Sequence, residues 1–323
     1  MNSHIYHTFL AGWCAESAGA RLEFSKKRFT DIEVNNAMHF IGDTTSGIYP
    51  GQITDDSEME ICLLNALIEG KNNEFFPLNI IGEKYIEWYH SEPFDIGQTI
   101  TFALIEAKNA QDILNNADEY NQHSESNGTL MRCIPLAIFG INKSDDILKT
   151  MVYMENELTH PNEIVKEITY IYCSLICNIL REKNNNNSIE NTKLLQIIRN
   201  LINSKQVLEW YNYGIKLFDI NTYDSITNEG HIKHAFIFII YFLKNITNYT
   251  YEEAIFKVIQ CGGDTDTNAK IIGNLFGAFY GNCVPLYMSN IVLNFNSSTL
   301  DCSFFRRPYK YNVKYAINLL NSI

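Results

Sequence analysis

The chain of 323 residues is predicted to be an all-α protein, and three observations support that fold class. Apolar residues recur at spacings of three and four along most of the chain, which is the pattern of an amphipathic helix. The strict alternation typical of a half-buried strand is nearly absent. The segment 236–242 is apolar on almost every side, as expected of a helix at the centre of a core.

The helical stripes follow one another along the whole chain. Ile5, Phe9 and Trp13 share one face of a first helix, which is expected to end near Gly19. Pro161 stands where a long helix would begin, because proline is favoured at the first helical position. Apolar stripes predict further helices over 59–67, 81–89, 164–179, 236–242 and 311–320.

One polar interruption stands between these helical segments. Four asparagines in a row, 184–187, predict a flexible insertion loop at 183–190. Both flanks carry helical stripes of the same kind, which favours an insertion within one domain over a domain boundary. Residues 1–323 are therefore expected to form a single compact domain.

Composition excludes several classes of function. The formal net charge of −12 argues against non-specific binding to nucleic acid or to an anionic membrane. No apolar run is long enough to span a bilayer. The first 19 residues lack a positively charged start and include Glu16, so they do not resemble a signal peptide, and a cytoplasmic location is expected.

The eight cysteines form no Cys-x-x-Cys pair, and most of them lie in apolar segments. This spacing argues against a zinc site and against a disulfide scaffold. Buried free thiols in a reducing compartment are the expected state.

The most informative stretch is 261–268, where two glycines precede Asp264, Asp266 and Thr267. Asp and Thr often begin helices, because their oxygens accept hydrogen bonds from the first free N–H groups. The same oxygens, held in a tight turn, are also the ligands that Mg²⁺ prefers. A single Asp-x-Asp caps helices far more often than it binds metal, so this motif needs partners elsewhere in the chain.

Glycines recur every four residues after this stretch, at 273, 277 and 281. Each glycine inside a helix costs up to roughly 1 kcal/mol relative to alanine. The stripe therefore predicts that this helix approaches another backbone closely.

A second acidic motif, Thr54-Asp55-Asp56, also precedes a helical stripe. Its simpler interpretation is again a helix start with acids that complement the helix dipole. If the two motifs faced one another, their carboxylates would repel, by roughly 4 kcal/mol for each pair about 4 Å apart at an effective dielectric of 20. Two bridged Mg²⁺ ions would relieve that repulsion.

Four further positions could carry chemistry, although each has a structural interpretation. Glu23 could be a surface acid, and Asp95 could be a turn residue. The segment 127–129 could present backbone N–H groups to a phosphate, or it could simply join a loop to a helix. His160 most often would be a capping or core histidine.

Taken together and in this order, the motifs resemble the ADP-ribosylglycohydrolase family, from about Thr8 to Pro285. The most specific parts are Thr54-Asp55-Asp56 and the stretch 262–267, followed by the glycine stripe at 273–281. Asp95-Ile96-Gly97, Asn127-Gly128 with Met131-Arg132, and Thr159-His160 also lie in the expected order.

The resemblance implies an orthogonal all-helical bundle whose cleft holds two Mg²⁺ or Mn²⁺ ions. Glu23, Asp95 and Asp56 would take part in catalysis. The substrate would be bound by Asn127, Gly128, Thr129 and His160. The metal ligands would be Thr54, Asp55, Asp56, Asp264, Asp266 and Thr267.

Two positions depart from the family pattern. Ala15-Glu16 stands where the family commonly has Gly-Asp, and the extra methylene would either move the carboxylate or make it structural. Thr129-Leu130 stands where the family commonly has two small residues, which could narrow the phosphate loop. Neither departure touches an expected metal ligand.

The resemblance implies a Mg²⁺-dependent hydrolase that removes ADP-ribose from a protein or small molecule, most simply from arginine. A monomer is expected. Alternatives are a serine, nucleobase or small-molecule linkage, another phosphate substrate, an ADP-ribose-binding module with weakened turnover, and a structural protein with this fold. The acidic residues argue against the structural role, which has no need of juxtaposed carboxylates.

Overall fold

The computed structural model describes residues 3–23, 25–42, 44, 47–185 and 187–323. Every regular element in these ranges is a helix, which confirms the all-α prediction. The chain divides into two compact units, and each is described by itself. A single domain over 1–323 stays a prediction. None of the described helices is both long and apolar enough to cross a membrane.

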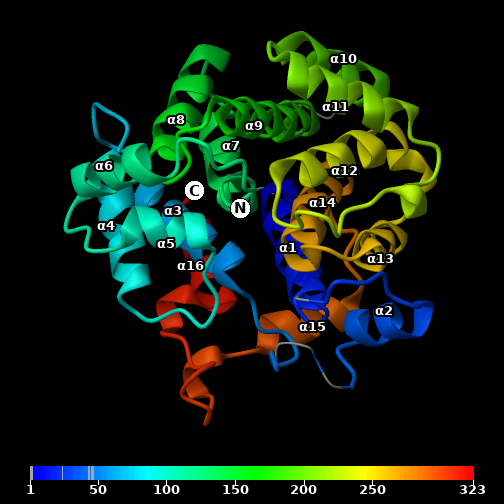
Figure 1. Cartoon of the computed structure of the whole chain (residues 1–323), viewed down its shortest axis with the longest axis horizontal. Coiled ribbons are helices and arrows are strands. Elements are labelled where there is room, and N and C mark those ends of the chain that lie inside the picture. Colours follow the sequence, from blue (N-terminus) through cyan, green and yellow to red (C-terminus); the bar gives the residue numbers. More distant parts are fainter. Residues whose placement is uncertain (1–2, 24, 43, 45–46, 186) are drawn as a thin grey trace. The chain divides into compact units, whose positions relative to one another are not determined.

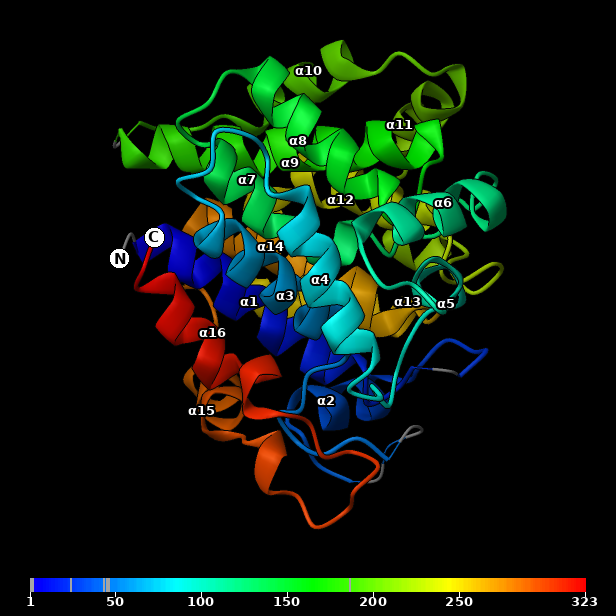
Figure 2. The same cartoon turned by 90° about the vertical axis from the view of Figure 1, so that its left-hand side faces the viewer.

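The first unit comprises Thr54–Cys177 and Asn296–Ile323. Its centre is α3, whose inward face of Met59, Leu63 and Ala66 is fully buried. The helix α3 packs against α4, α7 and α16, and Figure 2 shows α3 and α4 side by side. The helices of this unit are α3 (Asp55–Glu69), α4 (Leu78–Tyr89), α5 (Gln98–Leu104), α6 (Ala110–Tyr120), α7 (Ile134–Gly140), α8 (Asp145–Glu157), the first part of α9 (Glu163–Asn184) and α16 (Val313–Leu320).

The second unit comprises Asn2–Ile53 and Asn178–Phe295. Its main pairing joins α1 and α14, which lie side by side in Figure 1 in dark blue and orange. The helices of this unit, besides the last residues of α9, are α1 (Ser3–Gly19), α2 (Asp31–Met38), α10 (Asn191–Leu201), α11 (Lys205–Lys216), α12 (Ile232–Lys244), α13 (Tyr251–Cys261), α14 (Thr265–Tyr280) and α15 (Leu286–Asn294).

The glycine stripe explains how α1 and α14 come so close. A Cβ on Gly273 would lie 2.5 Å from the carbonyl oxygen of Ala11, and a Cβ on Gly277 would overlap the carbonyl oxygen of His7. Both are closer than real side-chain carbons approach, so only glycine fits at these positions. The predicted close backbone approach is confirmed, and its partner is α1.

Three local expectations differ slightly from the structure. The helix α9 begins at Glu163, two residues after Pro161, and continues to Asn184, the first asparagine of the polar run. The next helix, α10, begins at Asn191, so the irregular segment is 185–190, within which Asn186 lies outside the described residues. The buried thiols are as expected for six of the eight cysteines, whereas Cys283 is half-buried and Cys302 is exposed.

Candidate active site

The acidic motif of the first unit forms the start of α3. Thr54 is the N-cap residue with extended backbone, and Asp55 and Asp56 are the first two helical residues. Their side chains are only 1%, 8% and 2% exposed, respectively. Among the described residues, the Thr54 hydroxyl makes no capping hydrogen bond, so the motif is a helix start whose threonine oxygen is not used as a cap. Burying two carboxylates here is costly unless positive charge compensates them.

A third acid of α3 has a plain structural role. The carboxylate of Glu58 is held by Arg307, whose Nε donates at 2.9 Å, and by Trp88, whose indole N–H donates at 2.8 Å. Both Glu58 and Arg307 are almost fully buried. Glu58 therefore links the C-terminal segment to α3.

Asp95 lies in the irregular segment just before α5 and is half-buried. The N-cap of α5 is Gly97, so Asp95 is not itself the cap residue. The structure thus gives Asp95 a position at a helix entrance in the first unit, as the sequence suggested.

The segment Asn127–Thr129 leads directly into a short 3₁₀ helix, η1 (Leu130–Arg132). The Thr129 hydroxyl hydrogen-bonds that of Thr169 at 2.8 Å, and the Gly128 carbonyl accepts from Arg132 at 3.0 Å. Leu130, which departs from the family pattern, is buried and only 1% exposed. Its larger side chain is thus accommodated by the core.

His160 lies directly against this segment and is fully buried. Its Nδ1 is 2.8 Å from the Thr159 hydroxyl, and its Nε2 is 2.7 Å from the Ser126 hydroxyl. A Cβ on Gly128 would lie 2.9 Å from the imidazole Cε1, which explains the glycine at 128. Both ring nitrogens thus form hydrogen bonds within the chain. His160 therefore packs against the segment Asn127–Thr129 and supports it.

The acidic motif of the second unit forms the start of α14. Asp264 is the N-cap residue, and its Oδ1 accepts from the Thr267 N–H at 3.3 Å, which confirms the capping interpretation. Asp266 Oδ1 accepts from the same N–H at 2.8 Å. Asp264, Asp266 and Thr267 are 9%, 2% and 5% exposed, respectively.

The two glycines before this helix are required by the backbone. Gly262 and Gly263 have φ of 76° and 79°, a left-handed conformation that other residues rarely adopt. A Cβ on Gly263 would also overlap the carbonyl oxygen of Ser225, whose hydroxyl donates to the Gly262 carbonyl at 3.1 Å. The tight turn therefore fixes where Asp264 begins α14.

The end of α1 places Glu23 close to the start of α14. The Thr265 hydroxyl donates to the Gly19 carbonyl at 2.8 Å, so the last turn of α1 docks on the first turn of α14. Glu23, half-buried, follows four residues later. One of its carboxylate oxygens lies within 4.8 Å of one from Asp266. Within the second unit, the structure thus brings together an expected catalytic acid and an expected metal ligand.

Glu16, the other departure from the family pattern, is structural. Its carboxylate forms an ion pair with Lys270 of α14 at 3.1 Å, and both side chains are fully buried. The sequence reasoning overlooked Lys270 as a partner. A signal was present, because a lysine in a glycine-rich and apolar helix seldom lies buried without an acidic partner. Glu155, the buried partner of Arg132, was overlooked in the same way.

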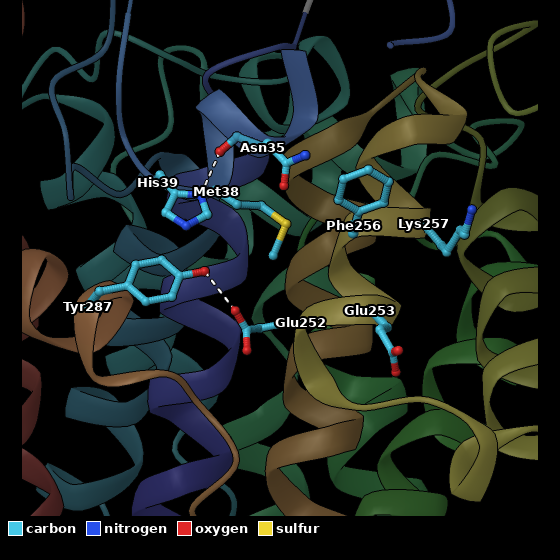
Figure 3. A pocket seen from close by; sticks show the side chains of 8 residues that line it. All are labelled: Asn35, Met38, His39, Glu252, Glu253, Phe256, Lys257 and Tyr287. Carbon is cyan, nitrogen blue, oxygen red and sulfur yellow. Dashed lines mark hydrogen bonds between the residues drawn. The ribbon is translucent and has the colours of Figure 1, made fainter. Parts of the chain in front are cut away.

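A cavity of about 190 Å³ lies elsewhere in the second unit, between α2, α13 and α15 (Figure 3). Tyr287 stacks on His39 with ring centroids 4.7 Å apart, and its hydroxyl donates to Glu252 at 2.9 Å. Glu253 is engaged in the capping box of α13. None of the expected site residues lines this cavity.

The expected metal ligands are suited to a hard divalent cation. Every one of them offers an oxygen, from a carboxylate or a threonine hydroxyl, and no sulfur or imidazole is included. All six side chains are at most 9% exposed, and each set is held at the start of a helix. Buried oxygen donors of this kind match the preference of Mg²⁺ and Mn²⁺ and not that of zinc.

Comparisons with known proteins show which family this chain is similar to. A family model described as ADP-ribosylglycohydrolase matches residues 2–297. A protein of Acanthamoeba polyphaga mimivirus with a provisional ADP-ribosyl glycohydrolase name is 28% identical over 89% of this chain and 90% of its own. The ADP-ribosyl-[dinitrogen reductase] glycohydrolase of Rhodospirillum rubrum is 22% identical over 84% of each chain. An ADP-ribosylarginine hydrolase of Pseudomonas putida is 24% identical over 82% of this chain and 67% of its own.

A solved structure described as an ADP-ribosylglycohydrolase-related protein complex shares the fold. Its TM-score is 0.71 at 20% identity, and the match covers 90% of this chain and 92% of that one. Since the family model matches nearly the whole chain, this protein belongs to the ADP-ribosylglycohydrolase family.

Proposed function

We propose that this chain hydrolyses the N-glycosidic bond of ADP-ribose linked to arginine, and that it depends on Mg²⁺. The observation that carries the proposal is the closeness of Glu23 and Asp266, whose carboxylate oxygens lie within 4.8 Å at the start of α14. One relative is named as an ADP-ribosylarginine hydrolase, which supports arginine as the acceptor. Another is named for ADP-ribosyl-[dinitrogen reductase], which supports a modified protein as the substrate.

Two Mg²⁺ ions, or Mn²⁺, would be held by the oxygens of Thr54, Asp55, Asp56, Asp264, Asp266 and Thr267. When bound, they would supply positive charge that holds the ribose hydroxyls and lowers the cost of gathering carboxylates. The substrate would be an ADP-ribosylated protein or small molecule, and the enzyme would act in the cytoplasm as a monomer.

The chain's own residues would carry the proton transfers. Glu23 is half-buried beside Asp266, so its carboxylate is placed to accept a proton from the attacking water. As the bond from the anomeric carbon to the guanidine nitrogen breaks, positive charge develops on the sugar. The carboxylates of Asp56 and its neighbours would favour that charge. Asp95 would position the guanidine or return a proton to it.

The remaining expected residues would bind the rest of ADP-ribose. Asn127, Gly128 and Thr129 would face the diphosphate, with His160 behind them. Leu130 is buried in the core and Glu16 is paired with Lys270, so neither departure from the family pattern disturbs this arrangement. No observation therefore favours the alternative of a binding module that has lost turnover.

The linkage is tested by incubating the protein with arginine-, serine- and nucleic-acid-linked ADP-ribose, each in Mg²⁺ and in EDTA. We expect release of ADP-ribose from the arginine-linked substrate in Mg²⁺ alone. Release from another linkage only would correct the acceptor. Tight ADP-ribose binding with no release from any substrate would instead support a binding module.

A further inference from the structure

A buried chain of polar side chains lies behind the segment Asn127–Thr129, entirely within the first unit. It begins at Arg132, which is fully buried and stacks over the Tyr85 ring with 4.9 Å between guanidinium carbon and ring centroid. Arg132 Nε donates to the Glu155 carboxylate at 2.7 Å. This ion pair compensates the buried charge and orients the planar guanidinium.

The other two nitrogens of Arg132 bind the segment Asn127–Thr129 and the residue next to His160. Its Nη1 donates to the Gly128 carbonyl at 3.0 Å, and its Nη2 donates to the Thr159 hydroxyl at 2.6 Å. Asn121 links two further parts of this region, because its side-chain amide donates to the backbone carbonyls of both Thr99 and Thr159. The guanidinium thus connects the backbone of Gly128 to the residue before His160.

The direction of the hydrogen bonds follows from the donor capacity of each group. Arg132 can only donate, so the Thr159 oxygen is an acceptor in that contact. The Thr159 proton then needs an acceptor of its own. Within the part of the chain that the structure describes, His160 Nδ1, at 2.8 Å, is the one recorded for it. If Nδ1 carried a proton instead, the buried Thr159 hydroxyl would lose its acceptor, which is unfavourable.

His160 therefore carries its proton on Nε2, which donates to the Ser126 hydroxyl at 2.7 Å. Ser126 in turn donates to the Thr99 hydroxyl at 3.2 Å, and Thr99 lies 2.8 Å from the Ser124 hydroxyl. The hydrogen bonds of this chain thus run from donor to acceptor in one consistent order, from the guanidinium of Arg132 to Ser124. Burial, together with the nearby charge of Arg132, lowers the pKa of His160 well below its ordinary value, in agreement with a neutral ring.

We propose that Arg132, Thr159 and His160 are positioning residues that hold the segment Asn127–Thr129 in shape, with His160 fixed as the neutral Nε2–H tautomer. The imidazole contacts the position of Gly128 from behind, while Arg132 holds the Gly128 carbonyl. That the segment binds ADP-ribose rests on the proposed function. The assignment of the His160 tautomer is independent of the proposed function.

The tautomer is measured first, by long-range ¹H–¹⁵N NMR of the histidine side chains in the full chain, with His160 assigned by comparison with His160→Gln. We expect Nε2 to be protonated and Nδ1 to be unprotonated at neutral pH. A protonated Nδ1, or a doubly protonated ring, would overturn the proposal.

Thr159→Val then removes the hydroxyl that joins Arg132 to His160, and Thr159→Ser retains it. We expect the valine variant to lose the single tautomer and to bind ADP-ribose about tenfold more weakly, as the loss of one hydrogen bond to a charged group would give. The serine variant should restore both. Thr8→Val is the matched control, since the buried Thr8 hydroxyl donates to the helix carbonyl of His4, in the second unit.

The outcomes separate the two proposals. Wild-type affinity in Thr159→Val, despite a lost tautomer, would overturn the positioning role. Equal weakening by Thr8→Val would also overturn it, because the effect would then be a general loss of stability. If the wild type has the Nε2–H tautomer but binds no ADP-ribose, the proposed function fails while the hydrogen-bond chain is supported.

Discussion

At the scale of single residues, Glu16 departs from the family pattern, and its buried carboxylate is paired with Lys270. Lys270 is fully buried in α14, four residues after Asp266, and its ammonium meets Glu16 of α1. A buried ion pair contributes little by itself, but removal of one partner leaves a charge in a medium that solvates it poorly. The Glu16 carboxylate and the Lys270 ammonium therefore depend on each other.

Lys270→Met should destabilise the protein by about 3–5 kcal/mol, because the Glu16 carboxylate loses its buried cation. Glu16→Gln combined with Lys270→Met should recover much of that loss. Chemical denaturation measures both. A single Lys270→Met variant as stable as the wild type would show that the pair is not required. Lys205→Met, at the exposed pair with Glu209, is the control and should change stability little.

His160 makes a prediction about pH. Its pKa in the folded chain lies below that of the unfolded chain, so the unfolded chain binds more protons as the pH falls below about 6.5. The free energy of unfolding should therefore fall on acidification, with a slope of up to about 1.4 kcal/mol per pH unit from this residue. His160→Gln should flatten the slope between pH 7 and 5. An unchanged slope in His160→Gln would show that this histidine does not resist protonation.

At the scale of elements, the start of α14 depends on its packing against α1. The turn at Gly262 and Gly263 determines where the helix begins, and the docking of Thr265 on the Gly19 carbonyl carries Glu23 toward Asp266. Further along, the glycine stripe lets the two backbones approach. The geometry of the acidic group is thus a property of the helix pair and not of the motif alone.

Gly273→Ala tests this dependence. The new Cβ would lie 2.5 Å from the Ala11 carbonyl oxygen and 2.8 Å from the Ala15 Cβ, so the helices would have to separate. We expect a loss of about 1–3 kcal/mol in the free energy of unfolding. Gly97→Ala is the control, because its Cβ would lie 4.0 Å from the Ile100 Cδ1, an ordinary van der Waals distance. Equal stability of Gly273→Ala and the wild type would show that the close approach is dispensable.

The elements also show how far the sequence could be interpreted. The period of three to four predicted the helices, and the N-cap preference of Asp264 and the need for a close approach at Gly273 were both correct. The apolar segment 236–242 is indeed a buried helix. Each of these depends on neighbours in sequence or on the size of one residue.

Contacts between positions far apart in the chain could not be predicted from local sequence patterns. Glu16 and Lys270 are 254 residues apart, and nothing local in either segment specifies the other. Likewise, nothing near His160 in the sequence specified that Thr159 and Ser126 would engage its two ring nitrogens. The hydrogen bonds of Arg132 could not be predicted from periodicity, because a buried cation is recognised only once its surroundings are known.

At the scale of the whole molecule, the acidic motifs lie in separate compact units, Asp55 and Asp56 in the first and Asp264 and Asp266 in the second. The net charge of −12 adds to the cost of gathering carboxylates, which bound cations would offset. Loss of one expected ligand should therefore affect metal binding and catalysis together. An asparagine in place of Asp266 should leave the helices intact, because it has nearly the size of aspartate and its Oδ1 can still accept from the Thr267 N–H.

The most direct test combines titration calorimetry with Mg²⁺ or Mn²⁺ and release of ADP-ribose from an arginine-linked substrate, both measured on the wild type, Asp266→Asn and Asp56→Asn. Glu252→Gln, whose carboxylate lies at the separate cavity of Figure 3, serves as the control. We predict that the wild type and the control bind metal and release ADP-ribose, that both asparagine variants lose both properties, and that EDTA abolishes release by the wild type. Full release by Asp266→Asn, or by the wild type in EDTA, would contradict the proposed metal-dependent hydrolysis.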